Sequence, residues 1–164
     1  MKVFGFAGWS GSGKTTLIEQ LIPRFVSHGL SVSLIKHAHH EFDIDQPGKD
    51  SYRHRNAGCT EVMVASDVRW ALMHEMRATP EETLEALLMR MAPVDLLLVE
   101  GWKLEPNPKI EVYRKANGNP LIYPDNDDII AIASDSQVET TLPRFGIDEY
   151  DHITQFVLES TGLK

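Results

Sequence analysis

The segment KVFGFAGWSGSGKTT, residues 2–16, decides the fold that we predict for this chain. Residues 2–7 form a short apolar run that is typical of a buried strand. The glycine-rich loop that follows has the spacing G-x-x-x-x-G-K-S/T of a P-loop. Beyond it, apolar residues recur at helical spacing up to about Ser27. A strand, a glycine loop and a helix in this order predict a phosphate-binding unit.

Each part of this loop has an expected role. Its backbone N–H groups curl around an anion, and the N-terminus of the following helix favours negative charge. Lys14 is expected to reach the β and γ phosphates of a nucleotide, and the hydroxyl of Thr15 to bind Mg²⁺. A strand–helix turn with an exposed lysine is the alternative, which the flanking strand and helix disfavour. The candidate nucleotide-binding residues here are Gly8, Ser10, Gly11, Ser12, Gly13, Lys14, Thr15 and Thr16.

The rest of the chain alternates strand and helix patterns. A strand at 31–36 completes a strand–loop–helix–strand unit, which implies a parallel pair with a right-handed crossover. A capping-box pattern predicts a helix that begins at Thr79 and ends at Pro93. Further strands are expected at 60–65, 69–74, 94–99, 109–114 and 128–133, and further helices at 50–57 and 148–159.

These elements predict one P-loop nucleotide-binding domain over residues 1–164. Its class is α/β: a P-loop NTPase-like fold of three layers, with a mostly parallel sheet and helices on both faces. An extra antiparallel hairpin, with its turn at Ser66-Asp67, is an optional addition.

Charge and composition limit the classes of partner that we expect for this chain. A net charge of −8 argues against nucleic acid as the main ligand, because phosphate neutralisation supplies most of that affinity. No apolar run approaches the roughly 20 residues that a membrane span needs. The single cysteine, Cys59, fits a reducing compartment. We therefore expect a cytoplasmic protein that binds neither nucleic acid nor membrane.

The strand at 94–99 leads into a carboxylate, Glu100. Ligands of parallel sheets gather at the carboxyl ends of strands, so Glu100 is the candidate for Mg²⁺ binding or for positioning water. Asp95 lies at the other end of the strand, roughly 16 Å away by strand rise. A solvated strand terminus is the alternative interpretation. Together with Lys14, Glu100 is a candidate catalytic residue.

A second carboxylate follows the strand at 128–133. Ser134 and Asp135 come directly after its apolar run. A carboxylate there can accept hydrogen bonds from N1–H and from the exocyclic amine of guanine, whereas adenine has no such donor pair. A Ser-Asp pair is also a common turn or helix cap, so base recognition by Ser134 and Asp135 stays open on the pattern alone.

The polar segment after the strand at 31–36 is rich in His and Asp. His37, His39 and His40 suit a transition metal such as zinc or nickel. The alternative is a polar loop near phosphates, in which Lys36 and His37 add positive charge and an aspartate supports Mg²⁺ through water. Asp45 is the candidate for that role, with Asp43 as the other choice.

The motifs together resemble the molybdopterin-guanine dinucleotide biosynthesis protein B family, MobB, of P-loop GTPases. The resemblance rests on Gly8 to Thr16 and on residues 35–51, 69–73, 95–103 and 133–135. It implies GTP and Mg²⁺ as ligands, weak intrinsic GTP hydrolysis and a homodimer. It also implies an accessory role in attaching GMP to the molybdenum cofactor, with the molybdenum cofactor guanylyltransferase and molybdopterin-bound proteins as partners.

The resemblance favours guanine recognition by Asp135. Two other functions stay open beside it. One is a small-molecule kinase that uses the same loop, although no arginine-rich lid is evident. The other is a nucleotide-gated metal-delivery GTPase that uses His37, His39 and His40.

Overall fold

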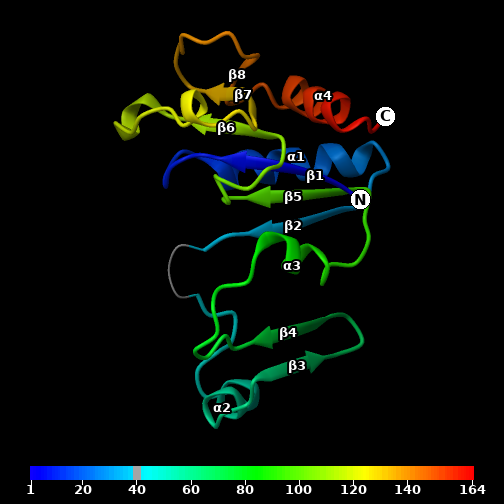
Figure 1. Cartoon of the computed structure of the whole chain (residues 1–164). Coiled ribbons are helices and arrows are strands. Elements are labelled where there is room, and N and C mark those ends of the chain that lie inside the picture. Colours follow the sequence, from blue (N-terminus) through cyan, green and yellow to red (C-terminus); the bar gives the residue numbers. More distant parts are fainter. Residues whose placement is uncertain (39–41) are drawn as a thin grey trace. The chain divides into compact units, whose positions relative to one another are not determined.

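The computed structural model describes residues 1–38 and 42–164, which fall into two units (Figure 1). The first unit contains Met1–His37 and Met91–Lys164, and the second spans Ala38–Arg90. The expectation of a single domain over residues 1–164 stays a prediction. In the described part of the chain, no helix has the length and apolar character needed to cross a bilayer.

The first unit is built on a six-stranded sheet whose pairings are all parallel. The carboxyl ends of the strands therefore meet at one edge. The predicted α/β class with a mostly parallel sheet is confirmed. In sheet order the strands are β2 (Val32–Lys36), β5 (Leu96–Glu100), β1 (Lys2–Ala7), β6 (Lys109–Tyr113), β7 (Ile129–Ser134) and β8 (Arg144–Gly146).

Two helices, α1 (Lys14–Ser27) and α4 (Tyr150–Thr161), pack on each other and on one face of this sheet. Apolar residues at helical spacing give each helix its buried stripe, and alternate residues of the strands supply the opposing surface. The side chains that fill this core include Phe4, Phe6, Leu17, Leu21, Phe25, Leu98, Ile110, Val112, Ile153 and Val157.

Buried charged residues project from β6 at positions that alternate with its core residues. Lys109 and Glu111 are only 1% and 0% exposed. The Lys109 ammonium donates a hydrogen bond to the carbonyl of Glu105, and burial lowers its pKa. The Glu111 carboxylate accepts hydrogen bonds from the amides of Ile122 and Tyr123, at 2.8 and 2.9 Å. These two side chains attach the flanking loops to the sheet.

The second unit holds a two-stranded antiparallel hairpin, so the optional hairpin of the prediction is confirmed. Its strands are β3 (Glu61–Ala65) and β4 (Trp70–His74). The amide of Ser66 donates to the carbonyl of Arg69, 2.9 Å away, and closes the turn. A short helix, α2 (Asp50–Asn56), precedes the hairpin.

The helix expected from Thr79 to Pro93 is shorter than predicted. It is α3 (Leu84–Leu88), and its cap is Thr83, whose hydroxyl accepts from the amide of Ala86. Thr79 instead donates its hydroxyl to the carbonyl of Met76 and closes a tight turn. Arg77 and Ala78 have positive φ values of 38° and 63° in this turn, so Thr79 ends a tight turn instead of capping a helix.

Candidate functional site

The glycine loop between β1 and α1 lies at the carboxyl edge of the sheet. Gly8, Gly11 and Gly13 have φ values of 146°, 77° and 95°, which disfavour residues with a Cβ atom. A Cβ atom at Gly8 would lie 2.4 Å from the carbonyl oxygen of Val112 and 2.7 Å from the Ser12 hydroxyl. The tight packing of the loop on β6 therefore requires glycine at this position.

The N-terminus of α1 opens onto this loop. Gly13 is its N-cap, and no described side chain caps the helix there or places an acidic group in its first turn. The first amides of a helix have no intrahelical acceptor, and the helix dipole adds partial positive charge. The backbone at this end of α1 therefore suits an anion such as a phosphate group.

The predicted phosphate ligand Lys14 lies within the loop. Its ammonium donates to the carbonyls of Gly8 and Trp9, both at 2.9 Å. Burial lowers the pKa of Lys14, the Glu100 carboxylate opposes that shift, and the ammonium groups of Lys103 and Lys36 add to it. Three ammonium groups thus act near one buried carboxylate, and the local excess of positive charge attracts anions.

The two residues predicted to bind Mg²⁺ in this unit are in contact. The hydroxyl of Thr15 donates to Oε1 of Glu100 over 2.6 Å. Glu100 is the last residue of β5 and is only 4% exposed. A hydroxyl and a carboxylate are hard oxygen donors of the kind that Mg²⁺ prefers, so the donor set fits that ion. The sequence placed these side chains at one sheet edge, and the structure brings them together.

Lys36 completes this cluster. Its ammonium donates to Oγ1 of Thr15 over 3.1 Å and lies 3.3 Å from Oε1 of Glu100. Sequence reasoning gave Lys36 only a general positive charge near the loop. The residue ends β2, which pairs with β5, but the order of the strands had to be known before that contact could be found.

The predicted base-recognition residue Asp135 follows β7, two strands away from β1. Arg114 connects it to the glycine loop: Nε donates to the carbonyl of Ser12 over 3.1 Å, and Nη1 lies 3.3 Å from Oδ2 of Asp135. Arg114 directly follows β6, the strand that separates β1 from β7. Sequence reasoning missed it, although a cation after a strand at the carboxyl edge was a usable signal.

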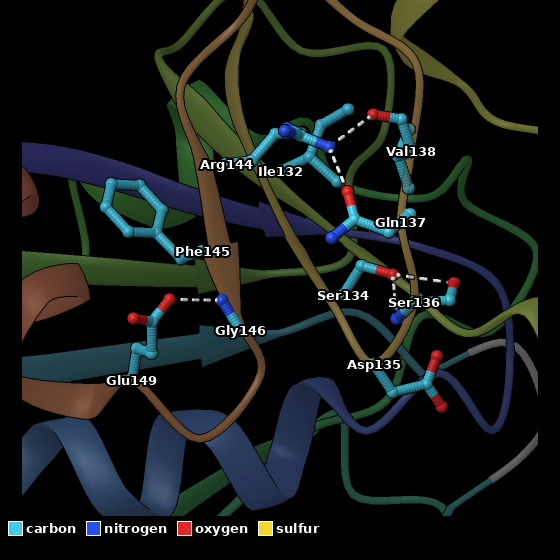
Figure 2. A pocket seen from close by; sticks show the side chains of 10 residues that line it. All are labelled: Ile132, Ser134, Asp135, Ser136, Gln137, Val138, Arg144, Phe145, Gly146 and Glu149. Atoms are coloured by element: carbon cyan, nitrogen blue, oxygen red, sulfur yellow. Dashed lines mark hydrogen bonds between the residues drawn. The ribbon is translucent and has the colours of Figure 1, made fainter.

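A pocket of about 400 Å³ lies between the ends of β7 and β8, and Asp135 contributes to its wall (Figure 2). Its volume is in the range of small-molecule sites. The predicted Ser134 is 8% exposed, and its hydroxyl accepts from the amide of Ser136 over 3.1 Å. The other side of the pocket is fixed by Arg144, which donates to the carbonyl of Val138 over 2.8 Å.

Further contacts hold the outer part of the glycine loop. The indole N–H of Trp9 donates to the carbonyl of Pro120 over 2.8 Å, and the Lys103 ammonium lies 3.8 Å from the centre of the indole ring. Asn117 donates to the carbonyl of Ser10 over 3.3 Å. Among the remaining predicted loop residues, Gly11 and Thr16 are exposed, and the Ser12 hydroxyl is buried beside Gly8 with no hydrogen-bond partner among the described residues.

The predicted outer Mg²⁺ residue Asp45 belongs to the second unit. There it accepts a hydrogen bond from the Ser51 hydroxyl over 2.8 Å, and its Oδ2 lies 3.7 Å from Nε of Arg55. The neighbouring Asp43 pairs with Nη2 of Arg55 at 2.6 Å, which lowers the pKa of Asp43. The structure gives these aspartates partners within their own unit, and the Mg²⁺ role of Asp45 stays a prediction.

The histidine segment is described only in part. His37 packs against Trp102, with ring centres 4.8 Å apart, whereas His39 and His40 lie outside the described residues. Across residues 1–38 and 42–164, no group of three or more His, Cys, Asp or Glu side chains is arranged to hold a metal ion.

The fold and the loop define the class: this chain is an α/β protein of the P-loop type, with a cationic site at the carboxyl edge of a parallel sheet. Comparison with known proteins identifies the family. The family model described as "Molybdopterin guanine dinucleotide synthesis protein B" matches residues 3–135. The chain therefore belongs to the MobB family.

Individual relatives agree with this assignment. The chain is 42% identical over 160 residues to the molybdopterin-guanine dinucleotide biosynthesis adapter protein of Escherichia coli, covering 96% of this chain and 91% of the relative. It is 40% identical over 159 residues to the adapter protein of Haemophilus influenzae, covering 94% and 86%. The crystal structure of Bacillus subtilis MobB superposes with a TM-score of 0.77 at 25% identity, covering 98% of each chain. These relatives support the adapter function and do not support the kinase or metal-delivery alternatives.

Proposed function

We propose that this chain acts as an adapter protein in molybdopterin-guanine dinucleotide biosynthesis and that it binds GTP with Mg²⁺ at the glycine loop. The observation that carries the proposal is the meeting of three features at one sheet edge. They are the loop with the uncapped end of α1, the contact between Thr15 and Glu100, and the link from the loop to Asp135 through Arg114.

Each group has a distinct task in this proposal. The loop amides and Lys14 bind the phosphates, because both are donors in a region of positive charge. Thr15 and Glu100 hold Mg²⁺, which when bound neutralises phosphate charge. Glu100 also positions water. Arg114 already contacts Ser12 and Asp135 before any nucleotide binds, so its guanidinium is less available to stabilise charge on the γ-phosphate. We therefore expect GTP hydrolysis to be slow.

Asp135 selects the base. Its side chain is 32% exposed and lies at the wall of the pocket in Figure 2, so the carboxylate can accept hydrogen bonds from the N1–H and the amine of guanine. Adenine lacks this donor pair, so Asp135 gains no hydrogen bond from it and the affinity for ATP is lower.

Calorimetric titration with GTP, ATP and GMP tests this function. We expect the wild type to prefer GTP over ATP, and Asp135→Ala to lose about tenfold of that preference. Asp127→Ala, which removes an exposed carboxylate elsewhere in the same unit, should keep it. Equal binding of ATP and GTP by the wild type would refute guanine selection, and no binding of either nucleotide would refute the nucleotide site.

Self-association is part of the proposal. The hairpin of β3 and β4 exposes large apolar side chains: Met63 is 61% exposed, Trp70 69% and Leu72 42%. Apolar exposure on a hairpin with open edges favours pairing with another chain. We assign this surface to a homodimer; a Trp70→Glu variant should be monomeric in light scattering, and an unchanged dimer would exclude Trp70 from the interface.

The remaining partners follow from the family. The molybdenum cofactor guanylyltransferase attaches GMP to the cofactor in the same pathway. We propose that the adapter works beside this enzyme and beside molybdopterin-bound proteins in the cytoplasm. The similarity to adapter proteins of this pathway over nearly the whole chain supports that role. Co-purification of the tagged chain with the guanylyltransferase tests it, and absence of any complex with or without GTP would count against it.

A further inference from the structure

Three polar atoms form a closed triangle beside the glycine loop. The Thr15 hydroxyl lies 2.6 Å from Oε1 of Glu100, and the Lys36 ammonium lies 3.1 Å from the hydroxyl and 3.3 Å from the carboxylate oxygen. A cation is therefore already present against the two oxygens that would bind Mg²⁺.

The backbone holds this arrangement in place. β2 and β5 are parallel neighbours, and their register sets Lys36 opposite Glu100 at the carboxyl ends of both strands. Side chains that are paired across neighbouring strands project from the same face of a sheet. The strand register thus delivers the Lys36 side chain to Glu100, while the start of α1 delivers Thr15.

The burial of the two charges is unequal. The Glu100 side chain is 6% exposed, whereas that of Lys36 is 52% exposed. A buried carboxylate needs a cationic or hydrogen-bonding partner, because an uncompensated charge is costly away from water. The half-exposed lysine can leave for solvent at a smaller cost. Glu100 therefore keeps its position while its cation can be exchanged.

We propose that Lys36 occupies the Mg²⁺ position as a built-in cation and that Mg²⁺ must displace it; this inference rests on the proposed binding of GTP with Mg²⁺. Mg²⁺ holds its oxygen ligands at about 2.0–2.1 Å, so an ammonium in contact with both oxygens excludes it from the same place. The Thr15 hydroxyl must also turn its lone pair from Lys36 toward the metal.

Two consequences follow. Without Mg²⁺, Lys36 neutralises phosphate charge beside the loop, and GTP retains part of its affinity. With Mg²⁺, the metal increases GTP affinity by a smaller factor, because the contact between Lys36 and Glu100 has to break before Mg²⁺ can bind. The coupling between Mg²⁺ and GTP is therefore weaker than the same loop would give without the lysine.

The test compares the wild type with Lys36→Met, which keeps an unbranched side chain and removes the charge. Lys103→Met is the matched control: it removes another ammonium near Lys14, but one that lies over Trp9 rather than between Thr15 and Glu100. GTP affinity is measured by calorimetry for all three proteins, with saturating Mg²⁺ and with EDTA. Paramagnetic resonance of Mn²⁺ with GTP present then gives the metal affinity directly.

In Lys36→Met, the ratio of GTP affinities with Mg²⁺ and with EDTA should rise about fivefold over the wild-type ratio, the equivalent of one ion pair. Mn²⁺ should bind more tightly to this variant, and Lys103→Met should change both quantities less. An unchanged or smaller ratio in Lys36→Met, with Mn²⁺ affinity equal to or below that of the wild type, would overturn the proposal. Failure of the wild type to bind GTP at all would instead refute the proposed function.

Discussion

The two carboxylates of the candidate site, Glu100 and Asp135, differ in how they reach the glycine loop. Glu100 ends β5, which pairs directly with β1, and it is in hydrogen-bond contact with Thr15 at the start of α1. Asp135 follows β7, and β6 separates that strand from β1. Arg114, placed after β6, spans the gap.

The two carboxylates also differ in how deeply they are buried. The Glu100 side chain is 6% exposed, whereas that of Asp135 is 32% exposed. A carboxylate on a strand next to the loop can bind directly and can be enclosed, while one that lies two strands away needs an intermediary and stays open to solvent. The comparison assigns metal chemistry to the first position and ligand selection to the second.

The largest effect is expected at the buried position. Glu100→Ala removes the carboxylate from Thr15 and Lys36, and Mg²⁺ affinity with GTP present should fall about 10- to 100-fold. Mn²⁺ binding measured by paramagnetic resonance checks this. Asp95→Ala is the control, because Asp95 precedes the other end of the same strand and bonds Ser31. Equal losses in both variants would show that the effect is structural.

A smaller effect is expected from the intermediary. Arg114→Met breaks the contacts with Ser12 and Asp135, both of which involve partly exposed groups. The preference for GTP over ATP should fall about three- to fivefold, in line with the modest energy of such ion pairs. Calorimetry with both nucleotides measures it, with Lys115→Met as the control at an exposed neighbouring position. An unchanged preference would mean that Asp135 does not need Arg114.

The smallest effect concerns Glu111, which supports the loop near Arg114. Burial raises the pKa of Glu111, and the amide hydrogen bonds from Ile122 and Tyr123 only partly oppose this. Because the folded-state pKa lies above the unfolded value of 4.5, Glu111 is protonated more readily in the folded protein. Its contribution to the free energy of unfolding is full below pH 4.5 and is lost as the pH rises through the folded-state pKa.

Glu111→Gln should remove this dependence. Urea unfolding of both proteins from about pH 4 to about pH 8 should show that the variant gains relative to the wild type as the pH rises, by about 1 kcal/mol or less. A constant difference across this range would contradict the raised pKa.

The sequence was most informative where one short pattern determines local structure. Glycine spacing and helical periodicity located β1, the loop and α1, and continuous apolar runs located β5 and β7. It was misleading at Thr79, because the capping-box pattern starts at this threonine and does not reveal that the residue closes a tight turn with positive φ at Arg77 and Ala78. β8 was missed because three residues carry too little periodicity.

The site was predictable in its residue types and only partly in its contacts. Thr15 and Glu100 follow from the motif and from the rule that strand ends gather ligands. The positions of Lys36 and Arg114 depend on which strands are neighbours, and strand order is a property of the whole sheet. A local pattern cannot supply it.

The contact between Trp9 and Lys103 gives the protein an optical reporter of its own. The indole of Trp9 donates to Pro120 and has the Lys103 ammonium 3.8 Å from its ring centre. The electric field of that ammonium therefore affects the wavelength at which Trp9 fluoresces. Any movement of the loop changes the field and with it the emission wavelength. With phenylalanine in place of Trp70 and Trp102, the remaining fluorescence comes from the loop itself, so its opening and closing can be timed without a label.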